Sequence, residues 1–343
     1  MNTMSNLADI AKSLVSPGKG ILAADESTGT IEKRFKSIQV ASTEESRRAY
    51  RELLFGAPGL GQYISGVILF DETLRQRAAD GTSMPELLRR QGIIPGIKVD
   101  RGAKALALFA GEKITEGLDG LRDRFAEYAR LGAQFSKWRA VITIGEGIPT
   151  PFCLEANAHA LARFAALSQE AGLVPIVEPE VLMDGSHTIE RCEEVTNDAL
   201  AVVFRALAAH HVQLEGMLLK PNMVVPGKDC ARHAGPSEVA EATLRSLRRF
   251  VPAAVPGIVF LSGGLSDVAA TQNLDAMNRL GPAPWELSFS FGRALQAPAL
   301  QAWAGKAENV GAAQKTLLHR ARCNHDARHG RYDETRERNS IGN

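Results

Sequence analysis

The sequence has no long apolar run and almost no excess of either charge. No stretch reaches the roughly 18 consecutive apolar residues of a membrane-spanning helix, and residues 1–20 contain no signal-peptide core. Lysine and arginine number 40 against 39 aspartates and glutamates, so the net charge does not indicate nucleic acid or a membrane surface as a partner. We therefore expect a cytoplasmic protein with neither kind of partner.

Motifs for metals, nucleotides and disulfides are also missing. The eight histidines show no H-x-x-H or H-E-x-x-H spacing, so we expect neither a metal nor a cofactor. The phosphate loop of nucleotide enzymes, G-x-x-x-x-G-K-[ST], does not occur. Reduced thiols are the simplest interpretation of the four cysteines, because none forms a C-x-x-C pair: Cys153, Cys192, Cys230 and Cys323.

What the sequence does contain is an alternation of short apolar runs and longer segments with helical spacing. Near-continuous apolar runs are typical of parallel strands that are buried on both faces. The eight runs are 20–25, 64–70, 93–100, 134–142, 173–180, 216–223, 257–264 and 285–293.

The segments between these runs place apolar residues three and four apart, as amphipathic helices do. Residues 155–172 are rich in alanine and leucine and end at a glycine. Ser42 and Glu45 have the spacing of a capping box for a helix that follows. Eight alternating β and α units predict an α/β fold, the (β/α)8 TIM barrel. A seven- or eight-bladed propeller has a similar period, but its blades lack long helices.

The chain shows one domain and no linker that divides it. Residues 294–325 have the pattern of further helix, so we expect the barrel domain to cover residues 1–325. Residues 326–343 are polar and charged, and we expect them to form a flexible C-terminal tail.

Charged residues interrupt the predicted strands near their carboxyl ends. Any single one could be an ordinary strand-end group that reaches solvent. Residues two apart on a strand share a face, however, and a barrel brings all the carboxyl ends of its strands to the end where active sites of this fold lie. The set is Asp25, Lys98, Lys137, Arg139, Glu178, Glu180 and Lys220.

Several lysines beside carboxylates favour Schiff-base chemistry. A lysine attacks a carbonyl only as its neutral amine, which partial burial and neighbouring cations both favour. Lys220 follows two leucines in an apolar run, and the carboxylates of Glu178 and Asp25 are suited to the proton transfers. An iminium on Lys220 would then act as the electron sink for cleavage of a carbon–carbon bond.

Two segments predict phosphate binding. Ser262, Gly263 and Gly264 end the seventh run, and Gly292 and Arg293 end the eighth. The loops after strands seven and eight are the usual phosphate site of this fold, although a glycine pair alone is more often an ordinary turn. A second basic group contains Thr30, Lys33 and Arg34, which could equally form a solvated helix face.

These segments together resemble class I fructose-1,6-bisphosphate aldolases from about Lys19 to about Lys306. The matching motifs occur in order and with family spacing: GKGILAADESTGT, SGVILFDETL, GIKVD, KWR, VPIVEPE, LEGMLLKPNM, FLSGG, FSFGRALQ and AWAGKAEN. The resemblance implies a lyase of glycolysis and gluconeogenesis that cleaves fructose 1,6-bisphosphate reversibly to dihydroxyacetone phosphate and glyceraldehyde 3-phosphate. It also implies phosphorylated sugars as binding partners and a homo-oligomer, since family members are commonly homotetramers.

The resemblance also implies a role for each residue of the site. Lys220 would form the Schiff base and Glu178 would be the main acid and base for it. Asp25 and Lys137 would assist cleavage, Lys98 and Arg139 would orient the substrate, and Glu180 would tune the lysine. The C1 phosphate would contact Ser262, Gly263, Gly264, Gly292 and Arg293, and the C6 phosphate Thr30, Lys33 and Arg34, with Thr30 standing where many members have serine.

The end of the sequence departs from the family. Members known from animals end in a tyrosine that helps to protonate the enamine, whereas this sequence ends Ser340-Ile341-Gly342-Asn343 and its last tyrosine is Tyr332. We expect Tyr332 to pack on the barrel wall rather than to reach the substrate.

Three other classes of function remain open on the residues alone. Transaldolases and deoxyribose-phosphate aldolases also use a lysine on a barrel, but two candidate phosphate sites disfavour a substrate with one phosphate. A binding or scaffold protein on an inactive barrel would not need the complete set of charged residues. A metal-dependent aldolase would need ligands that the histidine spacing does not supply.

Overall fold

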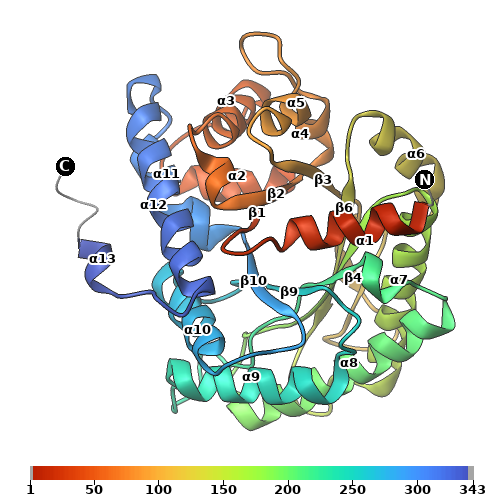
Figure 1. The fold of residues 1–343 in the computed structure, drawn as a ribbon. Helices are drawn as coiled ribbons and strands as arrows, with labels where there is room; N and C mark the ends of the chain where they lie inside the picture. The colour runs from red at the N-terminus through yellow and green to blue at the C-terminus, as the bar shows by residue number, and fades with distance from the viewer. Residues whose placement is uncertain (1–2, 339–343) are drawn as a thin grey trace.

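The computed structural model describes residues 3–338 and shows a closed barrel of eight parallel strands surrounded by helices (Figure 1). The order around the barrel is β1-β10-β9-β8-β7-β6-β3-β2. The predicted TIM barrel is therefore confirmed. Its strands are β1 (Gly20–Ala24), β2 (Ile64–Leu69), β3 (Ile94–Lys98), β6 (Phe135–Ile142), β7 (Val174–Val181), β8 (Leu218–Leu219), β9 (Gly257–Phe260) and β10 (Glu286–Phe291).

Helices follow the strands and cover the outside of the barrel. The long helices, such as α7 and α8, are the ones for which the sequence predicted an apolar stripe. In chain order they are α1 (Thr3–Leu14), α2 (Thr28–Lys36), α3 (Glu44–Phe55), α4 (Asp71–Arg75), α5 (Met84–Arg89), α6 (Leu121–Arg130), α7 (Pro151–Glu170), α8 (Ile189–Ala209), α9 (Pro236–Phe250), α10 (Asp267–Arg279), α11 (Arg293–Trp303), α12 (Val310–Arg328) and α13 (Thr335–Arg338).

The predicted capping box at the start of α3 is wrong by one residue. The cap is Thr43, whose hydroxyl accepts a hydrogen bond from the backbone N–H of Ser46 at 3.1 Å. Ser46 Oγ in turn accepts from the N–H of Thr43 at 2.9 Å. A serine thus takes the part expected of Glu45, because its short side chain reaches back to the cap residue within one turn.

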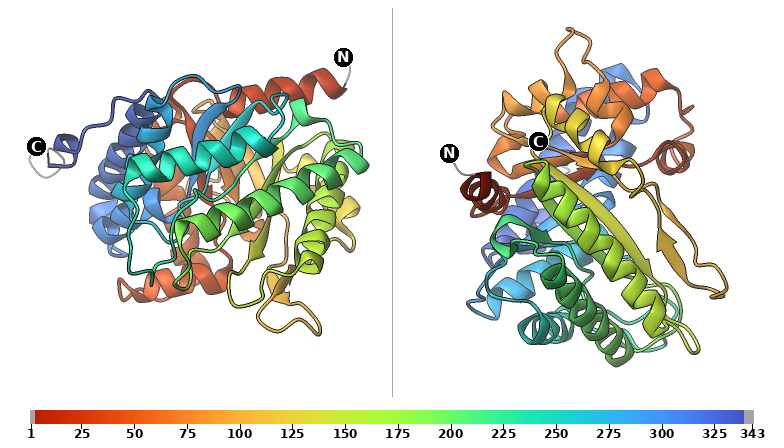
Figure 2. Two further views of the ribbon diagram at one scale, coloured as in Figure 1. Left: turned by 90° about the horizontal axis from the view of Figure 1, so that it is seen from below. Right: turned by 90° about the vertical axis from the view of Figure 1, so that its right-hand side faces the viewer.

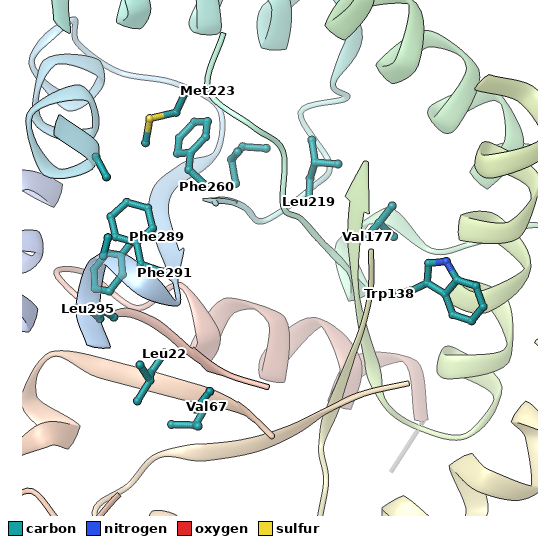
Figure 3. Packing of buried hydrophobic residues seen from close by; sticks show 14 of the residues in the cluster. Leu22, Val67, Trp138, Val177, Leu219, Met223, Phe260, Phe289, Phe291 and Leu295 are labelled. Carbon is teal, nitrogen blue, oxygen red and sulfur yellow. The ribbon is translucent and has the colours of Figure 1, made fainter. Parts of the chain in front are cut away.

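The strands separate the core into two layers, because successive side chains point to opposite faces. Residues on the outer face pack against the helices, among them Leu22, Val67, Val177 and Leu219 (Figure 3). Their neighbours Ile21, Ile68, Ile176 and Leu218 point inward and form a second cluster. The same alternation sends Lys137, Glu178 and Lys220 into the barrel, since Trp138, Val177 and Leu219 point out.

Helix α1 closes the amino-terminal end of the barrel. It crosses the strands at that end (Figure 1), and Leu7, Ala11 and Leu14 of the helix belong to the inner cluster of apolar residues. Burial of these side chains keeps water out from below. The opposite, carboxyl end of the strands is left for a site.

A hairpin that the sequence pattern did not predict projects from the end opposite α1 (Figure 2). It consists of β4 (Ala103–Ala105) and β5 (Lys113–Thr115), which pair antiparallel outside the barrel. Glu112 is buried beneath it and accepts hydrogen bonds from the N–H and the hydroxyl of Thr150, at 2.6 and 2.7 Å. These bonds fix the hairpin to the start of α7.

The predicted boundary between barrel and tail, at residues 325 and 326, falls inside α12. That helix continues to Arg328, whose buried guanidinium donates to the carbonyls of Leu287 and Val15 at 3.1 and 3.2 Å. Tyr332 packs as expected, with 5% of its surface exposed. Residues 339–343 of the predicted tail lie outside the described residues, and mobility of the segment stays a prediction. Among the helices of residues 3–338, none is long and apolar enough to cross a membrane.

Candidate active site

A cavity of about 950 Å³ opens at the carboxyl ends of the barrel strands. Every residue that the sequence predicted for the site lines this one cavity. They come from β1 and α2 (Asp25, Thr30, Lys33, Arg34), β3 (Lys98), β6 (Lys137, Arg139), β7 (Glu178, Glu180), the end of β8 (Lys220), and the loops after β9 and β10 (Ser262, Gly263, Gly264, Gly292, Arg293).

A chain of ion pairs runs through the middle of the cavity. Lys220 Nζ lies 3.2 Å from Glu178 Oε1, and Lys137 Nζ lies 3.1 Å from Glu178 Oε2 and 2.8 Å from Asp25 Oδ2. Lys220, Lys137 and Glu178 are all buried. Two lysines and two carboxylates thus share one desolvated space, where each amine has a carboxylate within reach of its protons.

The charged groups of these ion pairs stabilise one another in the ionised form. Burial alone would raise the pKa of Glu178, but Lys137, Lys220 and Arg139 outweigh it and bring the pKa below its ordinary value of 4.5. The pKa of Asp25 is likewise lowered, by Lys137 first, against the effect of burial. Burial lowers the pKa of Lys137, but the carboxylates of Asp25 and Glu178 raise it by more, so that the pKa lies above its ordinary value. Glu178 therefore begins as a base and Lys137 as a cation.

One oxygen of Glu178 is available to a ligand. Its Oε2 faces Lys137 but accepts no hydrogen bond of good geometry from the described residues. Ser290 Oγ, from β10, is buried and unsatisfied in the same sense, and Ser290 also lines the cavity. Buried polar groups without partners are costly, so two of them in one cavity indicate a polar ligand.

Two further ion pairs flank the central chain. Lys98 Nζ donates to Asp100 Oδ1 at 2.6 Å, and Arg139 pairs with Glu180. Burial lowers the pKa of Arg139, but the carboxylate of Glu180 outweighs this effect and raises the pKa above its ordinary value. Both cations therefore have a fixed direction before any ligand arrives, which reduces the entropic cost of orienting a substrate.

The loops after β9 and β10 bring backbone N–H groups to the rim of the cavity. Gly264 has φ +81°, a conformation that favours glycine, and a Cβ on Gly263 would lie 2.5 Å from Glu180 Oε1. Gly292 directly precedes α11, and Arg293 is the first residue of that helix. The rim thus combines a glycine turn, a helix N-terminus and an exposed guanidinium, a combination suited to an anion.

The second basic group lies on α2, which follows β1, the neighbour of β10 in the barrel. Thr30 and Lys33 are exposed there, whereas Arg34 already pairs with the buried Glu26. Glu26 also accepts from Arg51 Nη2 at 2.7 Å and from Gln296 Nε2 at 3.0 Å. This network holds Arg34 against the rim, and a phosphate role for the group stays a prediction.

Among the cavity residues that sequence reasoning missed, three are buried polar residues: Glu26, Asp100 and Ser290. Asp100 follows Lys98 at the same spacing of two that singled out the pairs on β6 and β7, so that rule could have found it. Glu26 stands next to Asp25 and is the buried anchor of Arg34, which no spacing indicates. Ser290 lies within an apolar run as an unremarkable serine, and only the finished barrel shows that it faces inward.

The arrangement suits a reaction in which a lysine adds to a carbonyl of an anionic substrate. Lys220 is the one cation of the central chain that is paired with a single carboxylate, and that carboxylate can exchange protons with it. Within residues 3–338, the group of histidine, cysteine and acidic side chains with metal-ligand spacing lies on α12 and α13, and none of its members lines the cavity.

Known proteins resemble the chain over nearly its whole length. The family model described as "Glycolytic: Fructose-bisphosphate aldolase class-I" matches residues 6–342. Fructose-bisphosphate aldolase 1 of Toxoplasma gondii is 57% identical over 95% of this chain and 90% of its own. "Fructose-bisphosphate aldolase 4, cytosolic" of Arabidopsis thaliana is 57% identical over 92% and 81%. A similar solved structure is that of fructose-bisphosphate aldolase from Plasmodium falciparum in complex with TRAP and a small molecule inhibitor. It superposes on this chain with a TM-score of 0.96 at 51% sequence identity. The match covers 97% of this chain and 96% of that one.

Proposed function

The chain belongs to the class I fructose-bisphosphate aldolase family, and we propose that within this lyase Lys220 carries the Schiff base. The enzyme cleaves fructose 1,6-bisphosphate reversibly to dihydroxyacetone phosphate and glyceraldehyde 3-phosphate, a reaction of glycolysis. The observation that carries the assignment is the contact of 3.2 Å between Lys220 Nζ and Glu178 Oε1 in a buried space. Borohydride trapping of the imine with substrate, followed by peptide mapping, tests it.

Glu178 serves formation of the imine in two steps. It accepts a proton from the Lys220 ammonium, which frees the amine to attack the C2 carbonyl of the sugar. It then returns a proton to the carbinolamine hydroxyl, so that water leaves and the iminium forms. One carboxylate can do both because it starts ionised and lies beside the amine in each step.

Asp25 and Lys137 serve the cleavage itself. The bond between C3 and C4 breaks when a base removes the proton of the C4 hydroxyl and the bonding electrons move onto the iminium nitrogen. Asp25 is ionised and 2.8 Å from Lys137, so it is the proposed base, and the fixed charge of Lys137 stabilises the developing negative oxygen. Lys98 and Arg139 orient the substrate hydroxyls, and Glu180 holds Arg139.

Phosphate groups at the two ends of the substrate fit the two basic rims of the cavity. We assign the C1 phosphate to Ser262, Gly263, Gly264, Gly292 and Arg293, and the C6 phosphate to Thr30, Lys33 and Arg34. The first group follows β9 and β10 and the second follows β1, so in this proposal separate loops bind the two phosphates while the ketone reaches Lys220.

Replacing Arg293 should reduce phosphate recognition. A charge-assisted hydrogen bond contributes about 1.5–3 kcal/mol, so Arg293→Ala should lower kcat/KM for fructose 1,6-bisphosphate by roughly 10- to 150-fold. An unphosphorylated analogue should be affected much less. Arg130→Ala, which removes an exposed arginine of α6 outside the cavity, is the matched control. Equal losses on both substrates would contradict the assignment.

Chelation should leave catalysis unchanged. The proposed steps use only side chains, so excess EDTA should not alter the steady-state rate of cleavage. The rate is measured before and after chelation, and again after zinc is added back. A large loss that zinc restores would indicate a metal-dependent reaction instead.

The proposed setting is a cytoplasmic homo-oligomer, a tetramer by analogy with the family. Support for the compartment comes from relatives of Arabidopsis thaliana that are named cytosolic and from four cysteines that remain free thiols. Support for association comes from exposed apolar side chains beside the hairpin. Leu108 is fully exposed and Phe152, which stacks on Phe109, is 52% exposed. Light scattering of the purified chain measures the subunit count.

A further inference from the structure

Two arginines share one buried carboxylate at the edge of the catalytic cavity. Glu26 follows β1 and lines the cavity, although its side chain is only 5% exposed. Its Oε1 pairs with Arg34 on α2, and its Oε2 accepts a hydrogen bond from Arg51 Nη2 on α3 at 2.7 Å. Neither Glu26 nor Arg51 takes part in the proposed catalytic steps, so this buried ion pair has no role in the chemistry itself.

The two arginines differ in their access to the cavity. Arg34 lines the cavity, and its side chain is 25% exposed. Arg51 does not line it, and its side chain is 3% exposed. A buried guanidinium that loses its carboxylate is costly, so Arg51 stays paired with Glu26 when a ligand enters. A substrate phosphate can therefore contact Arg34 but not Arg51.

Further hydrogen bonds fix the buried pair to the barrel. Gln296, a buried residue of α11, donates from Nε2 to Glu26 Oε1 at 3.0 Å and to the carbonyl of Ala23 at 2.7 Å. Arg51 Nη1 donates to Gln296 Oε1 at 3.4 Å. Because these contacts come from β1, α3 and α11, the carboxylate of Glu26 has a fixed position that does not depend on Arg34.

One carboxylate can balance the charge of only one of the two guanidinium groups. Arg51 is the buried partner, so it compensates the charge of Glu26 and leaves the charge of Arg34 uncompensated at the cavity. Without Arg51, Glu26 and Arg34 would form a neutral pair, and a phosphate would have to compete with Glu26 for the guanidinium. Charges interact more strongly in a partly desolvated site than in water, so this difference should change the affinity for an anion.

We propose that Arg51 is a positioning residue for the substrate: it neutralises Glu26, so that Arg34 keeps its full positive charge toward the C6 phosphate. Arg51 acts through Arg34 and does not itself contact the substrate. The inference rests on the proposed assignment of Arg34 to that phosphate. It concerns the affinity for the substrate and makes no use of the Schiff base on Lys220.

Kinetics with two substrates test the role of the buried charge. Arg51→Met should raise KM for fructose 1,6-bisphosphate at least roughly tenfold, the lower end of the range for one charge-assisted hydrogen bond, with little change in kcat. Fructose 1-phosphate lacks the C6 phosphate, so its KM should change much less. Arg51→Lys keeps a charge beside Glu26 and should retain most of the affinity. The matched control is Arg48→Met on the same helix, because Arg48 lies outside the cavity and pairs with Glu45 and Glu52.

A double substitution separates the effect of charge from an effect of packing. Adding Glu26→Gln to Arg51→Met removes the carboxylate that competes with the phosphate, so the double variant should have a lower KM for fructose 1,6-bisphosphate than Arg51→Met alone. If Arg51 only packed α3 against the barrel, loss of a second buried group would not improve binding. Should Arg51→Met fail to fold, Arg51→Gln carries the same prediction, because its amide can donate to Glu26 but has no charge.

A ligand without a carbonyl separates this proposal from the Schiff-base assignment. Glucitol 1,6-bisphosphate cannot form an imine, and calorimetry should show its dissociation constant rising by a similar factor in Arg51→Met. Activity in Lys220→Ala would contradict the Schiff-base assignment but would not alter this comparison. Unchanged affinity in Arg51→Met and Arg51→Gln, equal losses for the two fructose phosphates, or a double variant that binds no better than the single one would each overturn the proposal.

Discussion

Lys220→Ala should lose at least roughly 10³-fold in the rate of cleavage of fructose 1,6-bisphosphate, because loss of a covalent nucleophile removes the step on which the others depend. Lys137 and Lys98 cannot take over. Lys137 is held as a cation by Asp25 and Glu178, and Lys98 is bonded to Asp100. The variant should still bind the substrate, since both phosphate rims are intact.

A second substitution separates the nucleophile from its charge. Lys220→Arg keeps a positive group beside Glu178, but a guanidinium does not form the imine. We expect it to be as inactive as the alanine variant. Substantial activity in Lys220→Arg would mean that the charge at this position matters and the imine forms elsewhere.

Borohydride reduction locates the imine directly. With fructose 1,6-bisphosphate present, reduction should add the mass of dihydroxyacetone phosphate to the peptide that contains residues 218–223. Reduction without substrate is the control and should leave that peptide unchanged. An adduct on the peptide of Lys137 or Lys98 would contradict the assignment of Lys220.

The barrel and most of the cavity could be predicted because two periodicities act together. Apolar runs buried on both faces fix the strands, and the alternation within each strand fixes which side chains point inward. Lys137 and Arg139 on β6, and Glu178 and Glu180 on β7, therefore had to face the same space once the barrel closed. Even β8, of two residues, is flanked by enough apolar sequence to be recognised.

Contacts between distant segments could not be predicted in this way. The pairing of Arg34 with Glu26, and of Glu26 with Arg51 on α3, depends on how α2 and α3 pack rather than on any spacing. The hairpin of β4 and β5 has too few residues to show a period. The end of α12 is polar in sequence yet buried, because Arg328 bonds to backbone carbonyls and to Glu286 at the base of the barrel. Burial lowers the pKa of Arg328 to about 10.

Glu178→Gln should lower kcat by roughly 10²- to 10⁴-fold, the range over which a positioned acid–base group contributes. The amide retains the size of the carboxylate but can neither take the proton of Lys220 nor return one to the carbinolamine. Imine formation should become slow, so borohydride trapping should proceed at a reduced rate and still label the peptide of Lys220. Unchanged trapping would mean that Glu178 acts only after the imine has formed.

The pH dependence tests why Glu178 is poised as a base. Burial would raise its pKa, and Lys137 is the cation that lowers it most. A carboxylate accepts a proton only while it is ionised, and it loses this ability as the pH falls through its pKa. The acid limb of kcat/KM should therefore occur at low pH in the wild-type enzyme. Lys137→Met removes that cation, and the acid limb should therefore move to higher pH, whatever the loss in maximal rate.

The pKa of Asp25 would shift in the same direction, because Lys137 is also its main cationic partner. Adding Glu178→Gln to Lys137→Met separates the two carboxylates: a limb that disappears belongs to Glu178, and a limb that persists at the raised pH belongs to Asp25 and would transfer the role of initial base to that residue.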